Sequence, residues 1–202
     1  MKPNHDQLFQ IASQQGGYFT AAQAHAVGIS AYLLWYHVRR GRYERARAKR
    51  GLYRLRHYPS SPNEHVIEAW LAAGPHAVVS HDSALALHGL SDVVPSKVHL
   101  TLPRAARWLA TRSRKRGIQV HTAAAPFKAH DVTTHEGVRV TAPARTILDA
   151  AQAGAAPEQV VLAIQQGVER GLVTARGLRA AAAQRSKRVR RLVERGLQGI
   201  AA

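Results

Sequence analysis

The stretch "SAYLLWYHVRRGRYERARAKRGLYRL", residues 30–55, decides how the first part of this chain folds. At helical spacing its first ten residues carry two stripes on opposite sides of a helix. Because only one stripe can face a small core, we expect the other to contact a partner. The first stripe holds Leu33, Leu34, His37 and Val38, and the second holds Tyr32, Trp35, Tyr36 and Arg39.

The segments on either side of this helix predict a known order of elements. Upstream, an apolar rhythm over residues 6–15 predicts a helix, and Thr20 is a good N-cap for a second one. Downstream of Gly41 the pattern has a period of two, with a turn at residues 48–51, which predicts a β-hairpin. Helices followed by a basic hairpin are typical of a winged helix-turn-helix, so we predict that the second stripe faces DNA.

The charge of the chain supports an anionic partner. It has 29 Lys and Arg against 12 Asp and Glu, a formal net charge of +17 and a pI near 11.4. Nine basic residues but only one acid, Glu44, lie between Arg39 and Arg56, whereas a merely solvated surface mixes both signs. We expect this segment to neutralise phosphates, which makes binding salt-dependent. The residues expected to bind DNA are Ser30, Tyr32, Trp35, Tyr36, Arg39, Arg40, Arg42, Arg45, Arg47, Lys49 and Arg50.

An aromatic stripe also has an alternative interpretation, because such stripes commonly belong to a core. In that case Leu34 would lie outside. Tyrosine hydroxyls, an indole N–H and a guanidinium are, however, donors suited to base edges and phosphates. Tyr32 and Arg39 are the strongest candidates, and Trp35 is also a candidate for a contact between domains.

A proline- and serine-rich segment, "HYPSSPN" at residues 57–63, predicts a domain boundary. We expect a winged helix-turn-helix domain over residues 1–57 and an independently folding helix-and-strand domain over residues 63–202, an α+β fold. Expected caps are Ser80 and, before Pro143, Thr141. The expected helices are 63–73, 81–89, 143–154, 157–170, 174–184 and 186–196, and the expected strands are 97–103, 117–123, 131–136 and 138–142.

The twelve histidines raise the question of a metal site. The densest group is His81, Asp82 and His88, but a metal needs three or four converging ligands. His121 and its neighbours in the predicted strands show no metal spacing, and the chain has no cysteine. We therefore expect neither a metal site nor a cofactor.

Motifs for catalysis are also missing from the sequence. No lysine has an acid two residues before it, and there is no phosphate-binding glycine-rich loop or nucleophile elbow. We expect a protein that is not an enzyme. Two alternatives stay open, an RNA-binding protein and a metal-dependent nuclease with an unrecognised site.

No apolar run approaches the roughly 18 residues that a membrane span needs. The first residues, "MKPNHDQLFQ", lack the apolar region of a secretory signal. We expect a cytoplasmic protein without a membrane partner.

Three strings carry a family resemblance. "VVSHDSALALHGLSDVVPSKVHLTLP" (residues 78–103) and "VRVTAPARTILDAA" (residues 138–151) resemble AbiEi-type antitoxins of the AbiE toxin–antitoxin and phage-resistance systems. "GISAYLLWYHVRRGRYERARAKRGLYRL" (residues 28–55) resembles the winged helix of that family. The resemblance implies a repressor that binds its own promoter and counteracts a nucleotidyltransferase-like toxin.

Basic residues in the second domain are candidates for contact with a nucleic acid or an acidic protein. We expect Arg145, Lys187 and Arg191 to take this part, although Arg145 is equally placed to pair with Asp149 one helical turn on. Two basic clusters, residues 104–116 and 176–195, have no assigned partner. We expect the second domain to carry the activity against the toxin.

Overall fold

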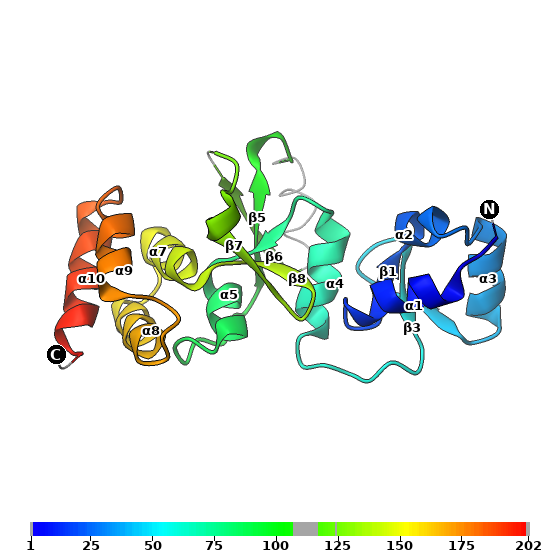
Figure 1. Cartoon of the computed structure of the whole chain (residues 1–202), viewed down its shortest axis with the longest axis horizontal. Coiled ribbons are helices and arrows are strands. Elements are labelled where there is room, and N and C mark those ends of the chain that lie inside the picture. Colours follow the sequence, from blue (N-terminus) through cyan, green and yellow to red (C-terminus); the bar gives the residue numbers. More distant parts are fainter. Residues whose placement is uncertain (1, 107–116, 124, 201–202) are drawn as a thin grey trace. The chain divides into compact units, whose positions relative to one another are not determined.

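The computed structural model describes residues 2–106, 117–123 and 125–200, and its fold is α+β (Figure 1). Most of the basic cluster at residues 104–116 lies outside the described residues; only a 3₁₀ turn, Arg104–Ala106, belongs to them. Contacts divide the chain into two units. The first is Met1–Ala77 with Thr134–Val138, and the second is Val78–Thr133 with Arg139–Ala202.

The first unit contains the winged helix-turn-helix that the sequence predicts. Its strands form one antiparallel sheet in the order β1-β3-β2. The β2–β3 hairpin with its connecting loop, residues 43–55, is called the wing below. The elements are α1 (His5–Ser13), β1 (Tyr18–Thr20), α2 (Ala21–Ala26), α3 (Ala31–Arg39), β2 (Tyr43–Arg45) and β3 (Leu52–Leu55).

Local capping explains where α2 and α3 begin. The Thr20 hydroxyl accepts from the Gln23 backbone N–H, and the Gln23 side chain accepts from the Thr20 N–H in a capping box. The Ser30 hydroxyl accepts from the Leu33 N–H at 3.3 Å. Gly28, at φ 81°, makes the tight turn between the helices.

One apolar cluster holds these elements together. Phe19, fully buried, stacks on Tyr53 and meets the edge of Tyr43, so β1 is fixed to both wing strands. Burial of such side chains stabilises by about 1.5–3 kcal/mol each. The buried members are Leu8, Ala12, Phe19, Ala24, Val27, Ile29, Leu34 and Tyr43.

Helix α4 (Glu64–Ala73) belongs to the first unit, which differs from the boundary expected at residues 57–63. Glu64 accepts from Arg54 at 2.6 Å, and Glu68 accepts from the Ala48 N–H at 2.9 Å. The wing is thus tied to α4 by acids that follow the prolines. The proline-rich segment turns the chain, and the contact boundary falls after Ala77.

In the second unit the described strands form a five-stranded sheet in the order β6-β5-β4-β8-β7. β5 pairs with β6 and β4 with β8 in parallel, while β4 and β5 are antiparallel. The strands are β4 (Val78–Val79), β5 (Val98–Pro103), β6 (Ile118–Ala123), β7 (Val132–His135) and β8 (Val138–Thr141).

The β7–β8 hairpin turns at Glu136 and Gly137, whose φ values of 47° and 76° suit a two-residue turn. A Cβ at position 137 would collide with the carbonyl oxygen of Gln14, so only glycine fits there. The tip belongs to the first unit, where Glu136 accepts from Ser61 and Asn63.

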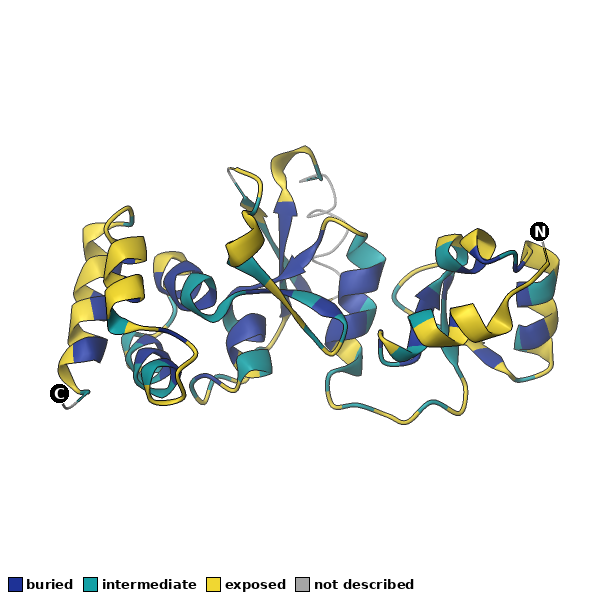
Figure 2. Cartoon of the chain, in the orientation of Figure 1, coloured by how far each residue is buried: buried dark blue, intermediate teal, exposed yellow. Residues whose placement is uncertain are grey.

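The helices of the second unit share a second apolar core. Buried positions lie on their inner faces, and the outer faces of α9 and α10 are largely exposed (Figure 2). No helix in the described ranges is long and apolar enough to cross a membrane. The helices are α5 (His81–His88), α7 (Pro143–Ala153), α8 (Pro157–Glu169), α9 (Ala175–Ala182) and α10 (Lys187–Gln198).

Ser80 and Thr141, which the sequence predicts as N-caps, make other contacts in the structure. Ser80 occupies the N-cap of α5, but its side chain makes no capping hydrogen bond and instead accepts from the Thr101 hydroxyl at 2.7 Å. Ala142, not Thr141, is the N-cap of α7. The Thr141 hydroxyl lies 2.6 Å from the Thr146 hydroxyl, because both are buried and need a partner.

Candidate nucleic-acid interface

The two stripes of α3 lie as the sequence analysis expects, one in the core and one exposed. Leu34 and His37 are 2% and 4% exposed, whereas Tyr32, Trp35 and Tyr36 are 68%, 44% and 38% exposed. The alternative in which Leu34 lies outside is therefore wrong. The aromatic stripe is a free surface of the first unit.

Stacking arranges the exposed side chains of α3 into rows. The Tyr32 and Trp35 rings stack with centroids 5.9 Å apart. The Arg39 guanidinium carbon lies 5.0 Å from the Trp35 centroid, and that of Arg40 lies 5.4 Å from the Tyr36 centroid. Such cation–π contacts restrict the arginine side chains while leaving N–H donors at the surface.

His37 anchors the inner side of α3. Its ring lies 5.0 Å, centroid to centroid, from the rings of both His5 and Tyr43. Neither ring nitrogen has a hydrogen-bond partner among the described residues. Burial, followed by the nearby His5 and Arg42, lowers the pKa of His37. The neutral ring therefore belongs to the core that positions the helix.

The wing, together with Arg42 just before it, presents arginines without acidic partners. Within the described part of the chain no carboxylate pairs with Arg42, Arg45, Arg47 or Arg50, and all four are exposed. The same holds for Arg39 and Arg40 on α3. Guanidinium groups that pair with no carboxylate keep their N–H donors available to phosphates.

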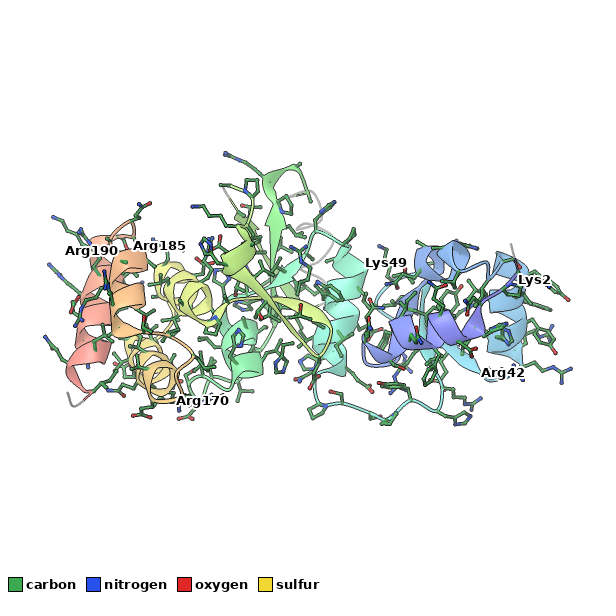
Figure 3. All side chains as sticks on the ribbon, viewed as in Figure 1. Lys2, Arg42, Lys49, Arg170, Arg185 and Arg190 are labelled. Carbon is green, nitrogen blue, oxygen red and sulfur yellow. The ribbon has the colours of Figure 1, made fainter. Side chains whose placement is uncertain are left out.

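Lys49 differs from the other basic residues expected to bind DNA. Its ammonium donates to the Ala72 carbonyl at 3.1 Å, at the C-terminal end of α4, where a helix favours positive charge. Lys49 therefore ties the wing to α4. Its side chain and that of Arg42 are labelled in Figure 3.

Two further arginines, Arg54 in the wing and Arg56 just after it, are absent from the expected set and are paired. Arg54 binds Glu64 at 2.6 Å, and Arg56 lies 3.3 Å from Glu44. The Ser30 hydroxyl caps α3, and its own O–H keeps one hydrogen to donate.

The basic residues expected in the second unit separate into two groups. Arg145 donates to Asp149 at 2.7 Å, and Arg185 donates to the other oxygen of that carboxylate at 2.7 Å. The structure therefore supports the alternative in which Arg145 pairs with Asp149. Lys187 and Arg191 are exposed on α10.

Sequence reasoning missed one side-chain cluster. His81, His99 and His121 each bring a ring nitrogen within 4.8 Å of the other two. His88, grouped with His81 in the sequence, contacts the Thr141 carbonyl instead, at 2.8 Å. The available signal was alternation along β5 and β6, which places His99 and His121 on polar faces of their strands.

Burial controls the protonation of this cluster. It lowers the pKa of His81 to about 3, assisted by His121 and His99. Burial and the neighbouring His99 lower the pKa of His121 to about 4. Both imidazoles are therefore neutral, with lone pairs, near pH 7.

Comparison with known proteins covers both units. A family model described as "Transcriptional regulator, AbiEi antitoxin" matches residues 6–56, and one described as "AbiEi antitoxin C-terminal domain" matches residues 76–195. Residues 57–75, which include α4, fall between the two matches. No curated protein matches the chain.

One solved structure extends the comparison to the whole fold. The crystal structure of the RV2827C protein from Mycobacterium tuberculosis is similar with a TM-score of 0.58 and 14% identity. The match covers 96% of this chain and 77% of that chain. At this identity the likeness concerns the fold alone.

Proposed function

Since the chain belongs to the AbiEi antitoxin family of transcriptional regulators, we propose that it binds double-stranded DNA at its own promoter through α3 and the wing. The observation that carries this proposal is the exposed face of α3. Tyr32, Trp35 and Arg39 are left out of the core and lie beside arginines without acidic partners. A helix face that contacts only water usually carries polar side chains of both charge signs rather than aromatic rings beside arginines.

The two parts of this surface have different tasks. In a helix-turn-helix the second helix of the motif enters the major groove, which places the N-terminal part of α3 and Tyr32 at base edges. Arg42, Arg45, Arg47 and Arg50 would neutralise phosphates on either side. Binding at its own promoter makes the protein a repressor of its own synthesis in the cytoplasm.

Fluorescence anisotropy of the full chain tests the DNA proposal. A labelled duplex from the region upstream of the coding sequence is compared with a scrambled duplex of equal length, each over a range of salt concentrations. We expect tighter binding to the upstream duplex and affinity that falls steeply with salt. Equal affinity for both duplexes, or stronger displacement by RNA than by duplex, would favour the RNA-binding alternative.

We further infer that the second unit counteracts a nucleotidyltransferase-like toxin. The support is the family, together with Lys187 and Arg191 exposed on α10. Co-expression with the product of the neighbouring gene tests this. We expect the full chain to restore growth, and Lys187→Gln with Arg191→Gln to weaken the rescue; failure of the full chain to rescue contradicts the role.

A fragment of residues 76–202, which starts where the C-terminal family match begins and leaves out α4, provides a separate test of the division of labour. Rescue by this fragment supports an antitoxic activity that does not need the DNA-binding surface. A nuclease is the remaining alternative, and incubation of the chain with labelled DNA and divalent metal distinguishes it, since we expect no cleavage.

A further inference from the structure

The histidine cluster of the second unit combines side chains from three elements. His81 is the first residue of α5, His99 lies in β5 and His121 lies in β6. Nδ1 of His99 and Nε2 of His121 are 3.3 Å apart, a hydrogen-bond contact in which one of the two nitrogens carries the proton. His81 is buried, while the other two are partly exposed, so the cluster has access to solvent.

The strands fix two of the three imidazoles. β5 and β6 are parallel, and their register places Thr101 opposite His121. His99 precedes Thr101 by two residues and therefore lies on the same face of the sheet. The intervening Leu100 points to the other face, where it is fully buried. The spacing of His99 and His121 is thus set by hydrogen-bonded backbone.

The third imidazole is held by an unusual backbone conformation and a hydroxyl network. His81 has φ 52°, in the left-handed region that residues other than glycine rarely adopt, and such residues concentrate at functional sites. Its Nδ1 lies 2.9 Å from the Ser80 hydroxyl, to which the Thr101 hydroxyl donates. If the ring N–H donates to Ser80, Nε2 is left with its lone pair.

From this geometry we propose that His81, His99 and His121 bind one divalent transition-metal ion of the Zn²⁺ class. Zinc–nitrogen bonds of about 2.0–2.1 Å in a tetrahedral site place two ligand nitrogens roughly 3.3–3.4 Å apart. The His99 and His121 nitrogens already have that separation. Imidazole ligands select Zn²⁺ and its neighbours over Mg²⁺ and Ca²⁺, which prefer oxygen.

The His81 ring has to move before the three imidazoles can share one ion. Its plane lies parallel to that of His121, 12° apart with centroids 3.5 Å apart, and parallel rings do not aim their lone pairs at one point. Metal binding therefore requires the His81 ring to turn out of this stack so that its free nitrogen faces the same ion as the other two. A three-histidine site leaves the fourth position open for water or another ligand.

Charges of both signs surround the cluster. Burial lowers the pKa of His99, the Asp82 carboxylate raises it, and Lys97, one of the nearby cations, lowers it. The nearby carboxylates of Asp149 and Asp82 each act to raise the pKa of His121, so they favour a positive charge at this ring. Arg145 and Arg185 act to lower the pKa of His81. Each of them donates a hydrogen bond to the Asp149 carboxylate at 2.7 Å. Asp149 offsets one of these two positive charges, and Asp131, 3.6 Å from Arg145, offsets the other.

Cobalt binding to the full, untagged chain tests the proposal. The protein is dialysed against a chelator and titrated with Co²⁺, whose tetrahedral complexes with nitrogen ligands absorb strongly in the visible, and Zn²⁺ is then added. We expect a tetrahedral spectrum that saturates at one equivalent and is abolished by Zn²⁺. No saturable binding, or a spectrum of octahedral type alone, would overturn the proposal.

Variants assign the ligands. His99→Gln and His121→Gln should each weaken Co²⁺ binding at least tenfold, while His25→Gln, at an exposed site on α2, should leave it unchanged. Equal binding by wild type and both cluster variants would mean that the metal sits elsewhere. Circular dichroism checks that each variant folds.

A measurement on the wild type needs no variant. Long-range ¹H–¹⁵N spectra report each imidazole nitrogen in the chain with and without Zn²⁺. We expect the ring nitrogens of His81, His99 and His121, and of no other histidine, to take metal-bound shifts at one equivalent of Zn²⁺. Shifts confined to other histidines would contradict the proposal even if the variants fail to fold. DNA binding by the first unit does not enter either readout.

Discussion

The Arg39 guanidinium lies over the Trp35 ring one helical turn away, with its central carbon 5.0 Å from the ring centroid. The Trp35 ring also stacks on Tyr32. The three side chains form a continuous exposed row on α3 that contributes little to the core. Preorganisation of this kind reduces the conformational entropy that an arginine loses when it binds.

We expect Tyr32→Ala and Arg39→Ala to reduce the discrimination between promoter and scrambled duplex by about 1–3 kcal/mol, the range for a specific base contact. Because both side chains are exposed, the free energy of unfolding should change by only about 0.5 kcal/mol. Anisotropy titrations and urea unfolding measure the two quantities. Leu34→Ala is the matched core control and should cost about 2–5 kcal/mol in stability.

Loss of the fold in Tyr32→Ala or Arg39→Ala would support the interpretation in which the aromatic stripe belongs to the core. Normal folding with unchanged discrimination would remove these residues from base recognition.

The wing arginines should act through phosphates. Arg47→Gln and Arg50→Gln should weaken binding to promoter and scrambled duplex alike, and each should reduce the slope of log affinity against log salt by about 0.9 per lost contact. Lys49→Gln is the contrasting variant, because its ammonium binds the Ala72 carbonyl. A Lys49→Gln slope change as large as that of Arg47→Gln would refute this distinction.

Helix α4 should stabilise the winged helix. A fragment of residues 1–77 keeps the contacts of Glu64 and Glu68 with the wing, whereas a fragment of residues 1–57 loses them. We expect the longer fragment to have the higher melting temperature. In the full chain, Glu64→Gln should cost about 1.5–3 kcal/mol, as expected for a hydrogen bond to a charged group. Equal melting temperatures of the two fragments would support the boundary at residues 57–63.

His37 should make the first unit sensitive to acid. Its folded pKa lies below the unfolded value of 6.5, so the unfolded chain binds the proton more readily. The stability contributed by the neutral ring is complete above about pH 6.5 and is lost as the pH falls through the folded pKa. His37→Phe keeps an aromatic ring in place and should flatten the dependence. Urea unfolding between about pH 7 and pH 5 measures it, and an identical slope in both proteins would assign it to other groups.

Much of the fold follows from local patterns in the sequence. The N-cap at Thr20 and the alternation of stripes on α3 are short-range signals, and the structure confirms the helices that they predict. The proline at position 143 likewise marks the start of α7. Such signals depend on neighbours within a few residues.

Long-range relations explain what the sequence did not reveal. The Arg54–Glu64 pair joins segments on either side of the proline-rich turn, so composition alone pointed to a boundary there. His99 and His121 lie 22 positions apart and meet only through the parallel register of β5 and β6. Thr141 was expected to cap a helix because it lies just before Pro143. Its burial beside Thr146 cannot be read from spacing in the sequence.

Hydrogen–deuterium exchange of the full chain with and without its promoter duplex tests most directly where DNA binds. We predict slower exchange, on duplex addition, in peptides that cover α3 and the wing, and the same protection lost in Arg39→Ala at equal protein and duplex concentrations. Protection confined to α10, with α3 and the wing unchanged, would contradict the account.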